Sequence, residues 1–349
     1  MISTGMKIGI LTAGGDCPGL NAAIRGVGKT AMLEYGMRVF GFSYGFSGLI
    51  DIDYHELTEN QLSGILTHGG TILGTSREKP FKKEEKAISG SNGNVVITKP
   101  DKIKENYKNL GLDCLVCIGG NGTMKTANLL RQEGLNVVGM PKTIDNDVWG
   151  TDITFGFDSA LQSATDAIDR LHSTANSHRR IMVIELMGHN TGWLALFAGL
   201  AAGGDIILIP EIPYTEGRII DCIKARYAHK KPYSIVVVAE GIQHDGSKTA
   251  ATHVADIIKE GTGFETRETI LGYIQRGGTP SPSDRILATR FGAYVAELIA
   301  RREFGAMVAL HGNELTTVSL SEAGTQTKLI DPDDQIIRYA RFIGTSFGD

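Results

Sequence analysis

Short apolar runs alternate with amphipathic stretches along most of the chain. The apolar runs contain few polar residues, which is typical of parallel strands that are buried on both faces. The predicted strands are 7–11, 39–42, 114–118, 137–140, 182–186, 206–209, 235–239 and 308–310. Strands alternating with helices predict an α/β fold of mainly parallel sheets covered by helices.

Between the apolar runs, hydrophobic residues recur at the spacing of a helix that buries one face. Predicted helices cover 20–35, 123–133 and 286–300, and a further helix follows Asp158. The side chain of Asp158 can cap the helix that follows it, and the side chain of Ser283 can cap the helix 286–300. The residues expected on the buried face of the last helix are Ile286, Leu287, Tyr294, Val295 and Leu298.

Composition and charge narrow the class of protein. The chain has 349 residues, which favours two domains, and its net charge of −4 argues against non-specific binding of nucleic acid. Cys114 and Cys117 form a C-x-x-C pair inside an apolar strand with no second pair to complete a zinc site, so reduced, buried cysteines are expected. We see no signal-peptide pattern and no run long enough to span a membrane, so a cytoplasmic location is expected. The polar stretch Lys79–Lys99 is predicted to be an exposed insertion.

Two glycine-rich segments each follow a predicted strand and precede a predicted helix. They are Gly14-Gly15-Asp16 and Gly119-Gly120-Asn121-Gly122-Thr123. Glycines at such junctions let backbone N–H groups approach a phosphate, and a helix N-terminus adds positive potential. Neither segment matches a Walker A loop, and a tight turn without ligand is the alternative for each. Two of them together favour phosphate binding.

The segment Pro141–Asp147 follows the strand 137–140 and carries Asp145 and Asp147 beside Lys142 and Thr143. Residues two apart on an extended backbone point to the same face, so both carboxylates are expected to point together. One can remove a proton from a hydroxyl while the other lies near a metal-bound phosphate. A polar turn leading into Trp149 is the alternative.

Arginines at predicted strand ends are candidates for binding a second phosphate, because a guanidinium bonds two oxygens at once. They are Arg180, Arg267 and Arg276, and any one of them could instead be a solvated surface residue. Glu240 ends the strand 235–239 and could accept a sugar hydroxyl or cap the next helix. Met187-Gly188-His189 follows the strand 182–186 and could contact a ligand through its backbone.

Together these segments resemble the 6-phosphofructokinase family along nearly the whole chain. The most specific are 8–25, Pro141–Asp147, Met187-Gly188 and Leu271–Gly278. The resemblance implies two similar α/β lobes with the active site in the cleft between them, and a homotetramer in which a homodimer is the minimum active unit. It implies a donor-nucleotide lobe of 1–157 plus about 275–325, and a sugar-phosphate lobe of 158–274 plus the C-terminal tail.

The resemblance also implies roles for single residues. Asp145 resembles the base that accepts the sugar hydroxyl proton, and Asp147 supports it near the metal. Residues that resemble the donor-phosphate site are Gly15, Arg77, Gly120, Asn121, Gly122 and Thr123. Asn121 stands at the position of a Mg²⁺ ligand. Residues that resemble the sugar-phosphate site are Thr143, Arg180, Met187, Gly188, His189, Glu240, Arg267, Tyr273 and Arg276, with Arg180 and Arg267 serving a neighbouring subunit.

The implied reaction is phosphoryl transfer from ATP–Mg²⁺ to O1 of fructose 6-phosphate. Gly122 resembles the ATP-using branch, whereas Lys142 is shared with the pyrophosphate-using branch. Asn121, His189 and Tyr273 depart from the residues that many members carry. A pyrophosphate-dependent transferase and a catalytically weak sugar-phosphate-binding subunit are the alternatives. Sedoheptulose 7-phosphate is a further candidate acceptor, because the phosphate pocket would be shared.

Overall fold

The computed structural model describes residues 5–82, 98–244 and 246–349, and the chain divides into two compact units. Unit 1 consists of Met1–Thr143, Val148–Gly156 and Gly278–Thr327, and unit 2 consists of Ile144–Asp147, Phe157–Gly277 and Lys328–Asp349. Each unit is an α/β structure, so the predicted fold class is confirmed.

Unit 1 is built on an eight-stranded sheet with the order β12-β11-β5-β4-β1-β2-β3, and β6 pairs with β5. The pairs among β2, β1, β4, β5, β6 and β11 are parallel, while β3 and β12 pair antiparallel at the two edges. The strands are β1 (Lys7–Thr12), β2 (Arg38–Phe42), β3 (Tyr54–Glu56), β4 (Cys114–Gly119), β5 (Val137–Thr143), β6 (Phe155–Gly156), β11 (Ala306–His311) and β12 (Glu314–Ser319).

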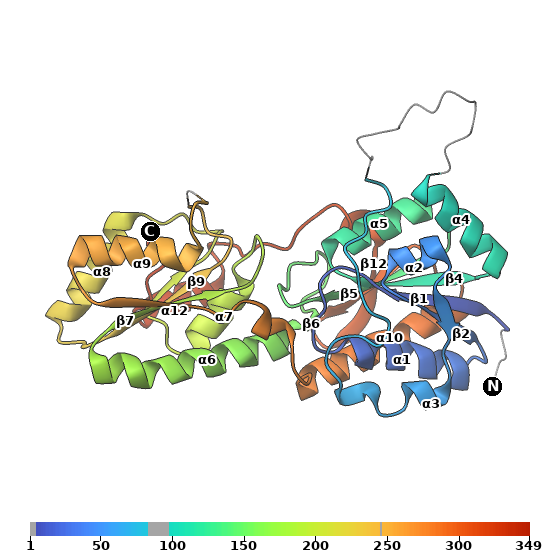
Figure 1. Cartoon of the computed structure of the whole chain (residues 1–349), viewed down its shortest axis with the longest axis horizontal. Coiled ribbons are helices and arrows are strands. Elements are labelled where there is room, and N and C mark those ends of the chain that lie inside the picture. Colours follow the sequence, from blue (N-terminus) through green and yellow to red (C-terminus); the bar gives the residue numbers. More distant parts are fainter. Residues whose placement is uncertain (1–4, 83–97, 245) are drawn as a thin grey trace, which may run out of the picture. The chain divides into compact units, whose positions relative to one another are not determined.

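Helices cover both faces of this sheet (Figure 1). The helices on one face, where α1 packs against α10, are α1 (Leu20–Leu33), α3 (Glu59–Leu62) and α10 (Pro282–Ala300). The helices on the other face are α2 (Phe46–Asp51), α4 (Lys99–Leu110) and α5 (Asn121–Gln132). The short helix α11 (Leu320–Ala323) packs against α5, and a 3-10 turn, η1 (Ile65–Thr67), packs against α1.

Unit 2 has a four-stranded parallel sheet with the order β10-β7-β9-β8. The strands are β7 (Ile181–Leu186), β8 (Ile206–Leu208), β9 (Ser234–Ala239) and β10 (Thr266–Ile270). The helices are α6 (Phe157–His178), α7 (Trp193–Ala201), α8 (Glu216–Ala228), α9 (Ala250–Thr262) and α12 (Gln335–Phe342), with a 3-10 turn η2 (Gly272–Arg276) after β10. Helices α6 and α7 pack together on one face, and α8 and α9 pack together on the other (Figure 1).

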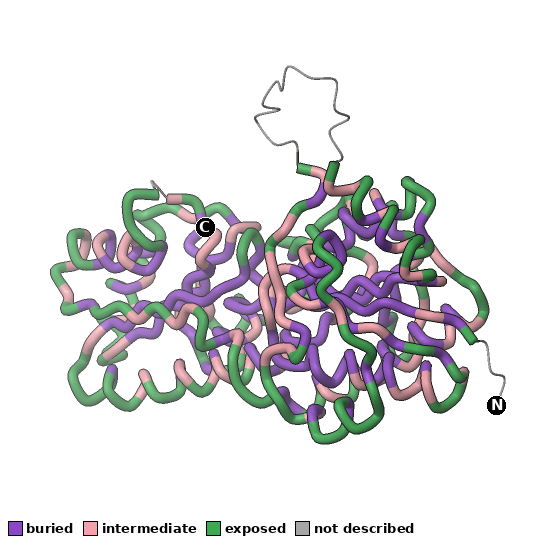
Figure 2. The backbone as a smooth tube through the Cα atoms, turned by 45° about the vertical axis from the view of Figure 1, so that its right-hand side comes forward, coloured by how far each residue is buried: buried purple, intermediate pink, exposed green. Residues whose placement is uncertain are grey.

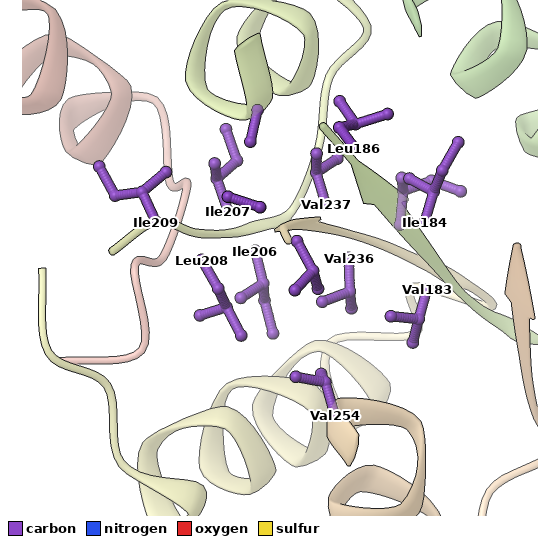
Figure 3. Close-up of a cluster of buried hydrophobic side chains, with 14 of the residues drawn as sticks. Val183, Ile184, Leu186, Ile206, Ile207, Leu208, Ile209, Val236, Val237 and Val254 are labelled. Atoms are coloured by element: carbon purple, nitrogen blue, oxygen red, sulfur yellow. The ribbon is translucent and has the colours of Figure 1, made fainter. Parts of the chain in front are cut away.

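The hydrophobic core of unit 2 explains the apolar runs of its sequence. Val183 and Val236 lie on the side of the sheet that faces Val254 of α9, while Ile184 and Val237 lie on the opposite side (Figure 3). All five side chains are inaccessible to solvent. Successive residues of one strand are therefore buried on opposite faces, so no polar position interrupts the run. Figure 2 shows the buried strands passing through the middle of each unit.

The structure corrects three details of the predicted helices. Helix α6 begins at Phe157, so Asp158 lies within its first turn rather than at the cap. The cap of α10 is Ser281 rather than Ser283, and its hydroxyl accepts the N–H of Asp284, because the helix begins at Pro282, four residues before the predicted start at Ile286. Ile286 is 61% exposed instead of buried, since the buried face of α10 passes through Asp284, Leu287 and Ala288.

Three further predictions concern the insertion, membrane spans and the cysteines. Of the stretch Lys79–Lys99, residues 83–97 lie outside the described residues, and its end forms the start of α4, where Thr98 and Asp101 make a capping box. Within the described ranges no helix is long and apolar enough to cross a membrane. None of the four cysteines, all of which lie among the described residues, forms a disulfide, and Cys114 and Cys117 are fully buried as predicted.

Candidate active site

The two glycine-rich segments lie side by side in unit 1. Strands β1 and β4 are parallel neighbours, and the N–H of Ala13 donates to the carbonyl of Ile118 at 3.0 Å where the two strands end. Because β5 is the next parallel neighbour of β4, Lys142 also reaches this edge of the sheet. The carboxyl edge of a parallel sheet is where ligands bind in open α/β folds.

The junction between β4 and α5 is shorter than its sequence suggests. Gly120 caps the helix, and the helix already begins at Asn121, so Gly122 and Thr123 belong to its first turn. A Cβ on Gly119 would lie 2.1 Å from the Thr123 hydroxyl oxygen, so this turn requires glycine there. A Cβ on Gly122 would meet no atom within 4 Å. The helix thus presents its N-terminal N–H groups with open space at Gly122.

Polar side chains hold the first glycine segment against the second. The Lys142 ammonium donates to the carbonyl of Gly15, and the Thr123 hydroxyl donates to the carbonyl of Ala13 at 3.4 Å. Both Lys142 and Thr123 are buried, with 3% and 5% of their surfaces exposed. A buried ammonium beside a glycine turn supplies positive potential where a phosphate would bind.

A third segment is bonded to the same turn. The N–H of Gly14 donates to the carbonyl of Ser76 at 2.9 Å, and the Thr75 hydroxyl donates to the carbonyl of Gly14 at 2.7 Å. Arg77 follows directly and is exposed. The predicted donor-phosphate residues Gly15, Arg77, Gly120, Asn121, Gly122 and Thr123 are therefore gathered at one edge of unit 1.

The two candidate catalytic carboxylates belong to unit 2, although the sequence places them in the first lobe. Strand β5 ends at Thr143 in unit 1, and residues 144–147 pack with unit 2. The Thr191 hydroxyl donates to the carbonyl of Asp145 at 3.3 Å, and the N–H of Lys328 donates to the carbonyl of Asp147 at 2.9 Å. These long-range bonds explain why the segment groups with unit 2.

The expected extended backbone between the two carboxylates is wrong. Asn146 has a φ of 53°, in the left-handed region, so the chain turns between Asp145 and Asp147. The two carboxylates nevertheless interact, because the charge of Asp145 contributes to raising the pKa of Asp147. A left-handed asparagine thus achieves the proximity that the strand argument assigned to an extended chain.

The pKa of Asp147 is raised to about 6. Burial of the carboxyl is the main cause, and the negative charge of Asp145 adds to it. The positive charges of His189 and Lys328 act in the opposite direction. A carboxyl with a raised pKa beside a second carboxylate is typical of acid–base sites.

The loop after β7 is bonded to the end of β9. Glu240 accepts the N–H groups of Gly188 and His189 through one carboxylate oxygen, at 3.2 and 2.8 Å. His189 has a φ of 53°, so this loop also contains a left-handed turn. The sequence-predicted residues Met187, Gly188, His189 and Glu240 therefore lie together at the carboxyl edge of the unit 2 sheet.

Arg180 and Arg267 lie at the opposite edge of that sheet. Arg180 directly precedes β7, and Arg267 is the second residue of β10, which is parallel to β7. Both guanidinium groups form ion pairs with Oε1 of Glu265, at 2.8 and 2.6 Å. Strand β7 has six residues, so its two ends are roughly 20 Å apart. The structure therefore does not bring Arg180 and Arg267 to the Glu240 cluster of their own chain.

The remaining predicted sugar-phosphate residues occupy η2 and the end of β5. Tyr273 is 74% exposed, and the Arg276 guanidinium lies 5.7 Å from the centre of its ring. The Nε atom of Arg276 is buried without a hydrogen-bond partner in the described structure. Thr143, the last residue of β5, belongs to unit 1 and accepts the Thr154 hydroxyl on its carbonyl.

Sequence reasoning missed Lys328, Trp193 and Glu265. Lys328 bonds the carbonyl of Asp147 through its backbone and Asn146 through its side chain, and Trp193 donates to the carbonyl of Lys328. Lys328 and Trp193 stand 135 residues apart, and no local pattern marks either one. Glu265 carries a weak signal, because it directly precedes β10, a strand that is too polar to be recognised from hydrophobicity.

The described residues contain no group of three or more histidines, cysteines, aspartates or glutamates that could hold a metal ion. This donor set does not fit a metal caged by protein ligands. It fits Mg²⁺ that is held mainly by the phosphates of a bound nucleotide, with one or two oxygens from the protein. Asn121, at the start of α5, supplies one amide oxygen in the donor-phosphate group.

Comparison with known proteins identifies relatives along almost the whole chain. The profile of the family described as Phosphofructokinase matches residues 7–299. The chain is 56% identical over 345 residues to "ATP-dependent 6-phosphofructokinase 3" of Bacteroides thetaiotaomicron, covering 98% of this chain and 100% of that protein. It is also 56% identical to "ATP-dependent 6-phosphofructokinase" of Spirochaeta thermophila, covering 98% of this chain and 97% of that protein.

Solved structures show the same fold. The phosphofructokinase of Saccharomyces cerevisiae matches with a TM-score of 0.81 at 32% identity, over 91% of this chain and 45% of that longer chain. A pyrophosphate-dependent phosphofructokinase from Marinobacter aquaeolei matches with a TM-score of 0.82 at 20% identity, over 98% of this chain and 92% of that chain. At 20% identity the second likeness concerns the fold alone.

Proposed function

This chain belongs to the phosphofructokinase family, and from that premise we propose that it transfers the γ-phosphoryl group of ATP to O1 of fructose 6-phosphate. The products are ADP and fructose 1,6-bisphosphate, so the enzyme acts in glycolysis. The observation that carries the proposal is 56% identity, over nearly the full length, to two relatives that are named as ATP-dependent. The geometry of the two glycine-rich segments and of the carboxylates Asp145 and Asp147 is consistent with that chemistry.

In the proposed reaction Asp145 is the general base. Its carboxylate takes the proton of the sugar O1 hydroxyl while O1 forms a bond to the γ-phosphorus and the bond from that phosphorus to ADP breaks. Asp147 lies close enough to Asp145 to feel its charge, and in this proposal it orients the base. Because the pKa of Asp147 is raised to about 6, Asp147 is mainly ionised only above that pH.

The donor phosphates bind, in this proposal, at the glycine segments of unit 1. The N–H groups at the start of α5 and the buried ammonium of Lys142 stabilise negative charge that develops on the transferred group. Gly122 leaves room for a nucleotide α-phosphate, since a Cβ there would contact nothing within 4 Å. Arg77 extends from the segment that is bonded to Gly14 and would contact the same phosphates.

Mg²⁺ would enter with ATP and supply charge neutralisation for the β- and γ-phosphates. Asn121 is the residue of this chain that we assign to it. A neutral amide holds Mg²⁺ more weakly than a carboxylate, so most of the ion's ligands would be phosphate oxygens and water. This assignment predicts that Mg²⁺ binds measurably only when nucleotide is present.

The sugar-phosphate site draws on unit 2. Met187, Gly188, His189 and Glu240 contact the sugar in this proposal, and we assign Thr143, at the end of β5, to the same substrate. Tyr273 and Arg276 bind the 6-phosphate from η2. Glu240 uses one carboxylate oxygen to hold the Gly188–His189 backbone. Its second oxygen is the one we assign to a sugar hydroxyl.

Arg180 and Arg267 serve a neighbouring subunit in this proposal. They lie at the amino edge of the unit 2 sheet, roughly 20 Å from the Glu240 cluster of the same chain. Glu265 holds the two guanidinium groups together as a pair. A homotetramer, with a homodimer as its smallest active unit, would complete each sugar-phosphate pocket. Four cysteines without a disulfide are consistent with a location in the reducing cytoplasm.

A pyrophosphate-dependent reaction is the second candidate, and Lys142 is the observation that favours it. The ammonium of Lys142 sits at the glycine turn, where it would support either donor. The open space at Gly122, however, does not exclude a nucleotide, and the two relatives at 56% identity are named as ATP-dependent. A catalytically weak sugar-phosphate-binding subunit is the third candidate, against which the coupled Asp145–Asp147 pair argues.

The test is a turnover assay of the purified protein that crosses donors with acceptors. ATP and pyrophosphate, each with Mg²⁺, are combined with fructose 6-phosphate and with sedoheptulose 7-phosphate. We expect the highest kcat/KM for ATP with fructose 6-phosphate. A higher kcat/KM for pyrophosphate would overturn the donor assignment, and absence of turnover with every pair would favour the binding subunit.

A further inference from the structure

Lys328 is bonded to the acid turn, defined here as Asp145-Asn146-Asp147, at two points. Its backbone N–H donates to the carbonyl of Asp147 at 2.9 Å, and its ammonium donates to the side-chain oxygen of Asn146 at 3.0 Å. All four residues belong to unit 2, which the chain re-enters at Lys328. Residues 182 positions apart in sequence are therefore joined at the proposed catalytic carboxylates.

Trp193, the first residue of α7, holds Lys328 in turn. The indole Nε1 donates to the carbonyl of Lys328 at 2.9 Å, and the Lys328 ammonium lies 5.1 Å from the centre of a Trp193 ring. An ammonium over an indole is attracted by the electron density of the ring face. The backbone and the charged end of Lys328 are thus both fixed by one side chain on a core helix.

The acid turn needs such support because Asn146 adopts a left-handed backbone. Its φ is 53°, and only 4% of its surface is exposed. A residue other than glycine in this region costs of order 1 kcal/mol and persists when surrounding bonds hold it. Lys328 bonds the side chain of Asn146 and the carbonyl of the next residue. It therefore holds the residue whose backbone conformation orients both carboxylates.

Charge adds to geometry at this turn. The groups that act on Asp147 are the carboxylate of Asp145 and the positive charges of His189 and Lys328. His189 is exposed, whereas the ammonium of Lys328 is packed on Trp193. Lys328 is therefore the positive charge whose position relative to the acid turn is fixed by bonded neighbours.

We propose that Lys328 is a positioning residue for phosphoryl transfer: its ammonium, seated on Trp193, locks Asn146 and thereby holds Asp145 and Asp147 in the reactive arrangement. This inference rests on the proposed function, since it assigns Lys328 to the catalytic turn of that reaction. The alternative is a structural staple whose loss lowers stability without changing the chemistry.

A series of substitutions separates these roles. All of them keep the backbone bonds to Asp147 and Trp193. Lys328→Arg keeps the charge and a donor for Asn146, Lys328→Gln keeps a donor without the charge, and Lys328→Met removes both while retaining a long side chain against the indole. Lys248→Met is the matched control, because Lys248 forms an exposed ion pair with Asp256 at 2.5 Å in the same unit.

We expect Lys328→Met to lower kcat by about 10- to 100-fold with less than a threefold change in the sugar KM, because misplacement of catalytic groups slows the chemical step. We expect Lys328→Arg to recover most of kcat. The acid limb of the kcat–pH profile should move up by roughly half a pH unit in both Lys328→Met and Lys328→Gln, since loss of a nearby positive charge raises the pKa of Asp147. Lys248→Met should change neither.

Two outcomes overturn the proposal. One is a folded Lys328→Met enzyme with wild-type kcat. The other is a loss of kcat in that variant with an unmoved acid limb, which would make Lys328 a structural staple. If Lys328→Met does not fold, the comparison of Lys328→Gln with Lys328→Arg provides the same test. Both variants keep a donor for Asn146, and they differ in the charge and the shape of the side chain.

One readout does not depend on turnover. If wild-type enzyme transfers no phosphoryl group, the proposed function fails, but the contact between Lys328 and the acid turn can still be measured. Lys328→Met should lose more stability at pH 8 than at pH 4.5, because the ionised Asp147 then lacks a compensating charge. An equal loss at both pH values would refute the charge interaction between Lys328 and Asp147.

Discussion

Asp147 is predicted to destabilise the folded protein that needs it for activity. The residue is 9% exposed, and the pKa of its carboxyl is raised from 3.8 to about 6, mainly by burial and then by the charge of Asp145. The folded state therefore holds the proton more tightly than the unfolded state. Stability falls as the pH rises from about 4 to about 6, and above that range the full cost of the buried charge is present.

The magnitude follows from the pKa. A difference of about two units corresponds to about 3 kcal/mol above pH 7, because each unit is worth about 1.4 kcal/mol. At pH 4.5 most of this destabilisation has not yet developed, and the buried carboxyl lowers the free energy of unfolding by about 1 kcal/mol. Asp147→Asn keeps the shape of the side chain and removes the charge. The variant should be more stable than wild type by up to about 3 kcal/mol at pH 8 and by about 1 kcal/mol at pH 4.5.

The assay is urea unfolding of wild type and Asp147→Asn at both pH values, followed by circular dichroism at one fixed protein concentration. The fixed concentration keeps any assembly equilibrium the same in each comparison. Asp256→Asn is the control, because Asp256 is an exposed aspartate of unit 2 whose pKa is lowered by Lys248. That variant should show no gain in stability.

A gain for Asp147→Asn that is the same at pH 4.5 and pH 8 would refute the buried-charge argument, since an uncharged cause does not depend on pH. No gain at pH 8 would refute it as well. A gain that grows with pH, together with loss of turnover in the same variant, is the expected result. It would mean that stability is given up for an ionised carboxylate at the active site.

Four further outcomes are expected. Asp145→Ser should lower kcat by at least about 10²- to 10⁴-fold with little change in the sugar KM; near-normal turnover in the folded variant would remove Asp145 as the base. Gly122→Asp should abolish ATP use at every ATP concentration while the melting temperature stays within a few degrees, because the added Cβ contacts nothing; retained ATP turnover would contradict the donor assignment. Mixing Arg180→Ala chains with Asp145→Ser chains should restore some activity in mixed oligomers, and failure to do so where mixed oligomers form would exclude a shared pocket. Wild-type kcat should fall as the pH drops through about 6, where Asp147 takes up its proton, and a profile flat to pH 5 would contradict that assignment.

The sequence by itself determined the class and order of the elements. Strands such as β4 and β9 are buried on both faces, so their apolar runs were recognisable without the structure. The same local reasoning found both glycine segments, and the parallel pairing of β1 with β4 brought them together as expected. Strand β10 escaped notice because it is a sheet edge with the polar sequence TRETI.

Only the tertiary structure decided how the acid turn is built and what holds it. The left-handed Asn146 replaces the extended backbone that the spacing of Asp145 and Asp147 suggested, and Lys328 reaches it across 182 residues of sequence. The structure likewise separated Arg180 from the Glu240 cluster, because the two lie at opposite ends of parallel strands. The physical reason is that hydrophobic periodicity records how each segment is buried, which is a local property. Contacts between distant polar side chains leave no such pattern, since each partner needs only a suitable position in the folded chain.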